Sequence, residues 1–81
     1  MMTRENIFGK LNLIFRDVFD DESINVTETT NSDDIEDWDS LEHINLVVAI
    51  EEEFKIKFEM NEVGKMKNVG EMVDVILSRI N

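Results

Sequence analysis

Apolar residues follow a helical spacing near the start of the chain. At about 100° per residue they fall on one arc of about 140°, with polar residues on the remaining arc. Thr3 precedes this pattern and is suited to cap a helix, and Gly9 falls on the polar side. The sequence therefore predicts an amphipathic helix over about 3–19, with these residues on its core face: Ile7, Phe8, Leu11, Ile14, Phe15, Val18 and Phe19.

A second helix is predicted over about 40–54, and its apolar residues form two stripes about 130° apart. One stripe suits a protein core and consists of Leu46, Val47, Ile50 and Phe54. The other consists of Leu41, Ile44 and Val48. This second stripe is either covered by a neighbouring helix or partly exposed for partners.

The last helix is predicted over about 69–79, where apolar residues again share one face. Asn68 and Glu71 have the spacing of a capping box, in which each side chain bonds the backbone N–H of the other residue. The stretch 55–67 has no long register and predicts an extended turn with a short helix over about 60–65.

Residues 20–39 lack periodicity and predict a long first loop, with apolar anchors at Ile24, Val26, Ile35 and Trp38. The expected fold is therefore all-α: a small up-down bundle of three main helices plus a short third helix, in a single domain over 1–81.

Composition excludes several kinds of function. With no Cys and one His, the chain can form neither disulfides nor a histidine- or cysteine-based zinc site. The net charge of -11 disfavours nucleic acid and anionic membranes as partners. No apolar run near the start suggests a signal peptide or a membrane span, so a soluble, cytoplasmic protein is expected.

The charge is unevenly placed. Residues 17–54 hold 14 acidic and no basic residues, whereas the remaining segments hold 5 acidic and 8 basic ones. A solvated surface that favours solubility explains acidic charge in general. The concentration of acidic charge in one segment favours the second interpretation, a surface that attracts basic partners and raises their rate of association.

Ser40 is the candidate for chemistry. Asp39 and Glu42 have capping-box spacing, which leaves the Ser40 hydroxyl free in the first helical turn; alternatively, Ser40 itself caps the helix. A hydrolase would need His43 as the base, but no nucleophile elbow with flanking glycines is present. The acidic residues of 33–39 do not match a calcium-binding EF-hand loop, so no metal site is predicted.

The segment DWDSLEHINLVVAIEEEFKIKF, residues 37–58, resembles the prosthetic-group segment of acyl carrier proteins, and VGEMVDVI, residues 69–76, is similar to the last helix of that family. The resemblance implies that Ser40 receives 4'-phosphopantetheine from a phosphopantetheinyl transferase that uses coenzyme A. Acyl or aminoacyl groups would then be carried as thioesters on the thiol of this arm, by a monomer that is not itself an enzyme.

The same resemblance assigns the recognition residues. Asp39 and Leu41 would serve the transferase. A loading ligase and downstream synthases or transferases with basic patches would dock on Glu42, Ile44, Val48 and Glu52. The position before Asp39 is often Gly in fatty-acid carriers and is Trp38 here, which favours a specialised pathway. The alternatives are housekeeping fatty-acid synthesis and an unmodified acidic interaction module.

Overall fold

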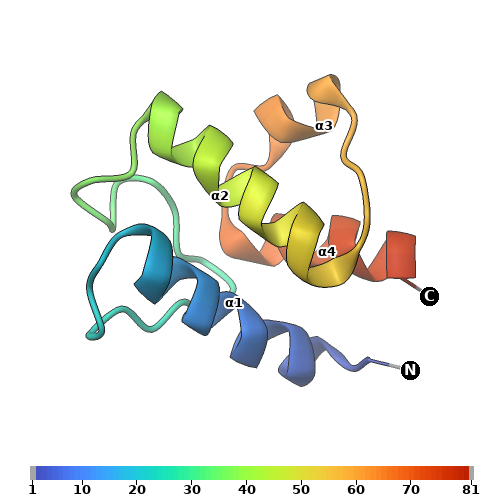
Figure 1. Ribbon diagram of the computed structural model, residues 1–81, viewed down its shortest axis with the longest axis horizontal. Coiled ribbons are helices and arrows are strands. Elements are labelled where there is room, and N and C mark those ends of the chain that lie inside the picture. The colour runs from blue at the N-terminus through green and yellow to red at the C-terminus, as the bar shows by residue number, and fades with distance from the viewer. Residues whose placement is uncertain (1, 81) are drawn as a thin grey trace.

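The computed structural model describes residues 2–80, and four α-helices account for most of them (Figure 1). They are α1 (Arg4–Val18), α2 (Ser40–Phe54), α3 (Met60–Lys65) and α4 (Val69–Ile80). No strand occurs in this range. In Figure 1, α1 runs opposite to α2 and α4, and the long loop closes one end of the molecule. The predicted all-α bundle with a short third helix and a long first loop is confirmed.

α1 begins where its sequence provides a cap. The Thr3 hydroxyl accepts a hydrogen bond from the Asn6 backbone N–H at 3.2 Å, and the Asn6 side chain accepts one from the Thr3 N–H at 3.1 Å. This reciprocal pair satisfies two donors that a helix start leaves free. Thr3 and Phe19 are therefore the caps of α1, and the helix is one residue shorter at each end than 3–19.

The core lies where α1 packs against α2 and α4. Most of its members come from the predicted core faces of the helices, since i, i+3 and i+4 positions share one helix face. Val26 and Trp38 of the long loop and Met66 after α3 are buried with them. Burial of these side chains provides the main stabilisation, about 1.5–3 kcal/mol for each large one. Nine of them are the largest fully buried side chains: Phe15, Ile7, Leu11, Leu46, Ile50, Met72, Ile76, Val69 and Val73.

Polar side chains of α1 hold the long loop. The Asn12 side chain accepts from the Val26 backbone N–H at 2.7 Å, and Arg16 Nε donates to the Ile24 carbonyl at 2.7 Å. Val26 is buried and Ile24 partly buried against the core. Loop backbone that lies against apolar side chains thus finds polar partners, as buried N–H and C=O groups require.

The loop also caps α4. The Val69 N–H donates to the Thr30 carbonyl at 2.8 Å, and the Gly70 N–H donates to the Glu28 carbonyl at 2.9 Å. These are donors of the first helical turn, which have no partner within the helix. The close approach requires glycine, because a Cβ at residue 70 would lie 2.7 Å from the Glu28 carbonyl oxygen.

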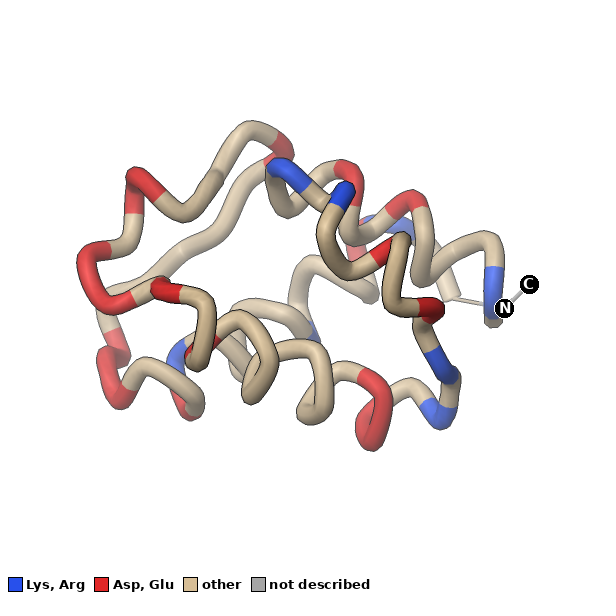
Figure 2. Tube along the Cα trace, turned by 90° about the horizontal axis from the view of Figure 1, so that it is seen from above, with Lys and Arg blue, Asp and Glu red and all other residues tan. Residues whose placement is uncertain are grey.

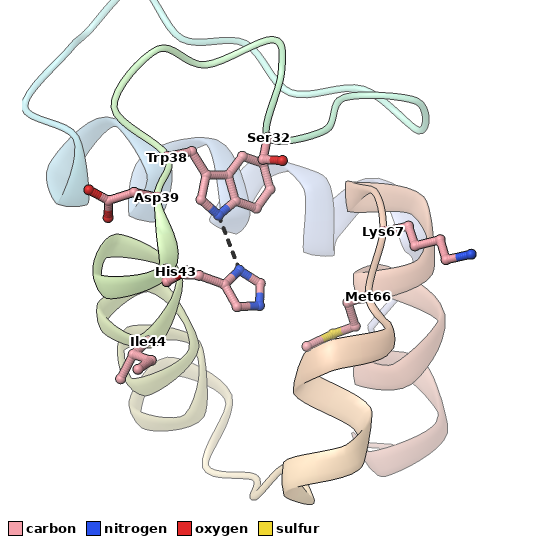
Figure 3. A pocket seen from close by; sticks show the side chains of 8 residues that line it. Ser32, Trp38, Asp39, His43, Ile44, Met66 and Lys67 are labelled. Atoms are coloured by element: carbon pink, nitrogen blue, oxygen red, sulfur yellow. Dashed lines mark hydrogen bonds between the residues drawn. The ribbon is translucent and has the colours of Figure 1, made fainter.

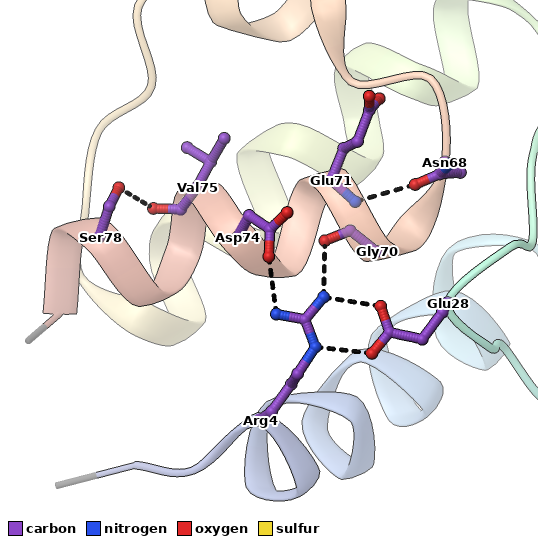
Figure 4. A network of polar contacts seen from close by, with 8 residues as sticks. All are labelled: Arg4, Glu28, Asn68, Gly70, Glu71, Asp74, Val75 and Ser78. Carbon is purple, nitrogen blue, oxygen red and sulfur yellow. Dashed lines mark hydrogen bonds and ion pairs between the residues drawn. The ribbon is translucent and has the colours of Figure 1, made fainter.

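Arg4 joins α1, the loop and α4 at this point (Figure 4). Its guanidinium donates to both Glu28 carboxylate oxygens at 2.6 Å, to Asp74 Oδ1 at 2.7 Å and to the Gly70 carbonyl at 3.1 Å. The hydrogen bonds from Arg4 hold the pKa of Glu28 below its ordinary value of 4.5. The planar guanidinium suits this role because it donates in several directions at once.

The capping box predicted at the start of α4 is half right. The Asn68 side chain accepts from the Glu71 N–H at 2.8 Å, as expected. The Glu71 carboxylate, however, accepts from the Lys67 N–H at 2.7 Å rather than from the Asn68 N–H. It therefore stabilises the turn before the helix by reaching one residue further back.

Candidate functional site

Ser40 stands at the first position of α2 with its side chain exposed. Asp39 caps this helix: its Oδ1 accepts from the Glu42 N–H at 2.8 Å, and its carbonyl accepts from the His43 N–H at 2.9 Å. The Ser40 hydroxyl makes no hydrogen bond within residues 2–80. Of the two alternatives, Asp39 is the cap, and the serine hydroxyl is left available.

The prediction that the Glu42 side chain accepts a hydrogen bond from the Asp39 backbone N–H, as in a capping box, is wrong. The Asp39 N–H, its expected partner, already donates to the Asp37 carbonyl at 3.0 Å. The Glu42 carboxylate instead accepts from the Asn45 amide at 3.2 Å. Glu42 is half-buried, so less of its carboxylate is accessible than was expected for a residue that docks basic partners.

An open groove of about 620 Å³ adjoins Ser40 (Figure 3). Its walls come from the end of the long loop, the first turns of α2, and the turn between α3 and α4. Both apolar and polar side chains line it: Ser32, Trp38, Asp39, Ser40, His43, Ile44, Met66 and Lys67. Sequence analysis did not assign Ser32, Met66 or Lys67 to the site, because they are distant along the chain and carry no local signal.

His43 spans the gap between α2 and α3 beside this groove. Its Nδ1 accepts from Trp38 Nε1 at 3.1 Å, and its Nε2 lies 3.1 Å from the Val63 carbonyl oxygen. Since Nδ1 accepts, the ring proton is assigned to Nε2, which donates to Val63. Both ring nitrogens are thus engaged away from Ser40, an arrangement that does not provide a base for a serine hydrolase.

The second apolar stripe of α2 is exposed. Leu41, Ile44 and Val48 are 66%, 57% and 46% exposed, whereas the first stripe is buried. No neighbouring helix covers it within the described chain, which decides between the two alternatives left open by the sequence. Adjacent exposed apolar side chains on one helix face are typical of interaction surfaces.

The acidic triplet at the end of α2 divides among three roles. Glu51 accepts from the Phe58 backbone N–H at 2.8 Å and so fixes the turn after the helix. Glu53 pairs with Lys10 of α1 at 3.3 Å. Glu52 is exposed and, among residues 2–80, has neither a hydrogen-bonding nor an ionic side-chain partner. Its charge is therefore available to a partner.

Acidic residues follow the long loop and the ends of α2, while Lys and Arg lie mostly elsewhere (Figure 2). This separation preserves in space the polarisation seen along the sequence. The exposed α2 stripe thus lies within the negative part of the molecule, where a field attracts basic surfaces.

Comparison with known proteins shows similarity to acyl carrier proteins along nearly the whole chain. An acyl carrier protein of Lactobacillus acidophilus is 32% identical over 95% of this chain and 96% of its own, and one of Picosynechococcus is 35% identical over 93% of both. The chain belongs to the acyl carrier protein family. The resemblance inferred from residues 37–58 and 69–76 is confirmed.

The solution NMR structure of a holo acyl carrier protein from Geobacter metallireducens gives an independent comparison for this carrier. It matches with a TM-score of 0.85 and 46% identity, covering 90% of this chain and 84% of the other. No family model matches the sequence. Within residues 2–80, no helix of the carrier is long and apolar enough to cross a membrane.

Proposed function

We propose that the protein carries acyl or aminoacyl intermediates on a 4'-phosphopantetheine arm attached to Ser40. The observation that supports this most directly is the exposed, unbonded Ser40 hydroxyl at the start of a helix capped by its neighbour Asp39. Family membership and the holo form of a structural relative agree with it. The role is that of a carrier in the cytoplasm, with chemistry performed by partner enzymes.

The residues present fit such an arm. Ser40 Oγ attacks the pantetheine-bearing phosphorus of coenzyme A and loses its proton; the pyrophosphate bond breaks, and adenosine 3',5'-bisphosphate leaves. The groove beside Ser40 offers room and mixed polarity for a chain with amide and methylene groups. When bound, the arm supplies the thiol on which cargo is held as a thioester, in a protein without cysteine.

Attachment is tested by incubating the protein with coenzyme A and a broad-specificity phosphopantetheinyl transferase. Mass spectrometry should show the addition of one phosphopantetheinyl group to the wild type and none to Ser40→Ala. Ser32→Ala is the matched control, because Ser32 lines the same groove, and this variant should be modified normally. An unmodified acidic interaction module predicts no addition to a correctly folded wild type.

Partner docking is proposed for the exposed α2 stripe and Glu52, with Asp39 and Leu41 serving the transferase and Glu42 a smaller electrostatic role. Apolar contacts supply adhesion, while the free carboxylate of Glu52 steers basic patches. Glu52→Lys should reduce kcat/KM of the loading ligase for the carrier several-fold, and more at low salt than at high salt. Glu5→Lys makes the same charge change on α1 and should leave this rate nearly unchanged.

The pathway is proposed to be a specialised one, with fatty-acid synthesis as the alternative. Trp38 before Asp39 supports this, since its indole is buried and bonded to His43, a role that glycine cannot perform. The acyl group found on protein purified from its own host would distinguish the two. A long saturated chain would favour the alternative.

A further inference from the structure

Two side chains on either side of Ser40 along the chain are bonded to each other. Trp38 lies two residues before Ser40, and His43 lies three residues after it. The hydrogen bond from Trp38 Nε1 to His43 Nδ1 at 3.1 Å therefore links the residues that flank the candidate attachment residue on both sides. The two ring planes are inclined by only 21°, with their centroids 5.9 Å apart, as an in-plane hydrogen bond between two rings requires.

Trp38, the first residue of this hydrogen-bonded pair, is fixed in the core. The indole is 9% exposed and meets Phe15 edge-on, with 5.3 Å between centroids; Phe19 lies at 6.2 Å. Aromatic contacts of this kind give a ring one preferred orientation. The orientation of Trp38 is therefore set by α1.

The His43 end is fixed to α3 through the Val63 carbonyl. α3 has six residues, and a helix this short is not stable without tertiary contacts. The Val63 carbonyl lies near its C-terminal end, where no intrahelical N–H reaches it, so the His43 bond satisfies an otherwise free acceptor. A continuous set of contacts thus runs from the core face of α1 through Trp38 and His43 to α3.

We propose that Trp38 and His43 are positioning residues for the modification of Ser40, an inference that rests on the proposed function. The Asp39 cap starts the helix; the Trp38–His43–Val63 contacts orient that start relative to α1 and α3 and fix two walls of the adjoining groove. A transferase then meets Ser40 in one arrangement and does not have to order it during docking.

The test is the rate of Ser40 modification, with coenzyme A and the transferase, in single and double variants. His43→Leu removes both bonds and places an apolar side chain there, and Trp38→Phe removes the donor while keeping an aromatic ring. Trp38→Phe loses one hydrogen bond and should lower kcat/KM by about two- to tenfold. His43→Leu loses two and should lower it by at least as much. Because the two residues act through one bond, the double variant should fall little below the worse single variant.

Rescue separates positioning from stability. Glutamine at 43 offers one acceptor and one donor, so His43→Gln should recover most of the rate. Ile76→Val weakens the core at a buried residue of α4 that does not line the groove; it should lower the melting temperature and leave kcat/KM unchanged. Circular dichroism checks that every variant is folded at the assay temperature.

Two results would overturn the inference and leave the proposed function intact. One is that wild type and His43→Leu are both modified, at equal rates. The other is that the loss of kcat/KM in the double variant equals the product of the losses in the two single variants. An unmodified wild type would instead refute the proposed function, and the inference with it.

Discussion

Gly70 and Gly9 offer a matched pair of substitutions whose effects on stability should have opposite signs. Both are helical, and both would become alanine. At Gly70 a Cβ would lie 2.6 Å from Glu28 Oε1, 2.7 Å from the Glu28 carbonyl oxygen and 3.3 Å from Asn68 Oδ1. At Gly9 a Cβ would meet nothing within 4 Å.

The magnitudes follow from two opposing effects. Alanine favours a helix over glycine by about 1 kcal/mol in its interior, so Gly9→Ala should raise the free energy of unfolding by about that amount. At Gly70 the nearest obstacle includes backbone, which cannot rotate away, and crowding of this kind costs about 1–3 kcal/mol. Moving the loop aside would lose the Gly70–Glu28 hydrogen bond, worth about 0.5–1.5 kcal/mol. Gly70→Ala should therefore destabilise by about 1–2 kcal/mol.

Thermal unfolding followed by far-UV circular dichroism measures the difference. For a domain of this size each kcal/mol shifts the melting temperature by about 4–8 °C, so the two variants should lie on opposite sides of the wild type and at least about 8 °C apart. A Gly70→Ala variant as stable as Gly9→Ala would refute the inferred contact between the loop and α4.

Three further predictions concern stability. Ile50→Ala should destabilise by about 2–5 kcal/mol because Ile50 is fully buried, whereas Val48→Ala, on the exposed stripe of the same helix, should change stability by less than about 0.5 kcal/mol; urea titration compares them. The lowered pKa of Glu28 means that its pairing with Arg4 stabilises above pH 4.5 and is lost as pH falls through the lowered value, so the melting-temperature difference between wild type and Glu28→Gln should vanish in acid. Salt or Mg²⁺ should raise the melting temperature by screening repulsion within 17–54, and a flat response would contradict this.

Local patterns in the sequence were enough to predict the helices and their core faces. The period of apolar residues in α1 placed Phe15 inward, and the cap at Thr3 marked where the helix begins. The two stripes of α2 were also visible in advance. Which stripe faced solvent depended on where α1, α3 and α4 pack, and periodicity does not specify this.

Contacts between distant residues could not be predicted. The Arg4 bonds to Glu28 and Asp74 and the groove beside Ser40 join segments with no shared local signal. The error at Glu42 has a similar origin: the Asp39 N–H was taken by the Asp37 carbonyl, a detail of loop geometry that residue spacing does not encode. Side chains choose among several nearby partners, and tertiary structure decides which one is available.

The buried indole of Trp38 also gives the protein an intrinsic fluorescence signal close to the candidate attachment site. Trp38 is the sole tryptophan, there is no tyrosine to compete with its emission, and it borders the groove next to Ser40. A molecule that enters this groove would change the polarity around the chromophore. Loading and unloading could then be followed in real time by fluorescence, with no label added to the protein.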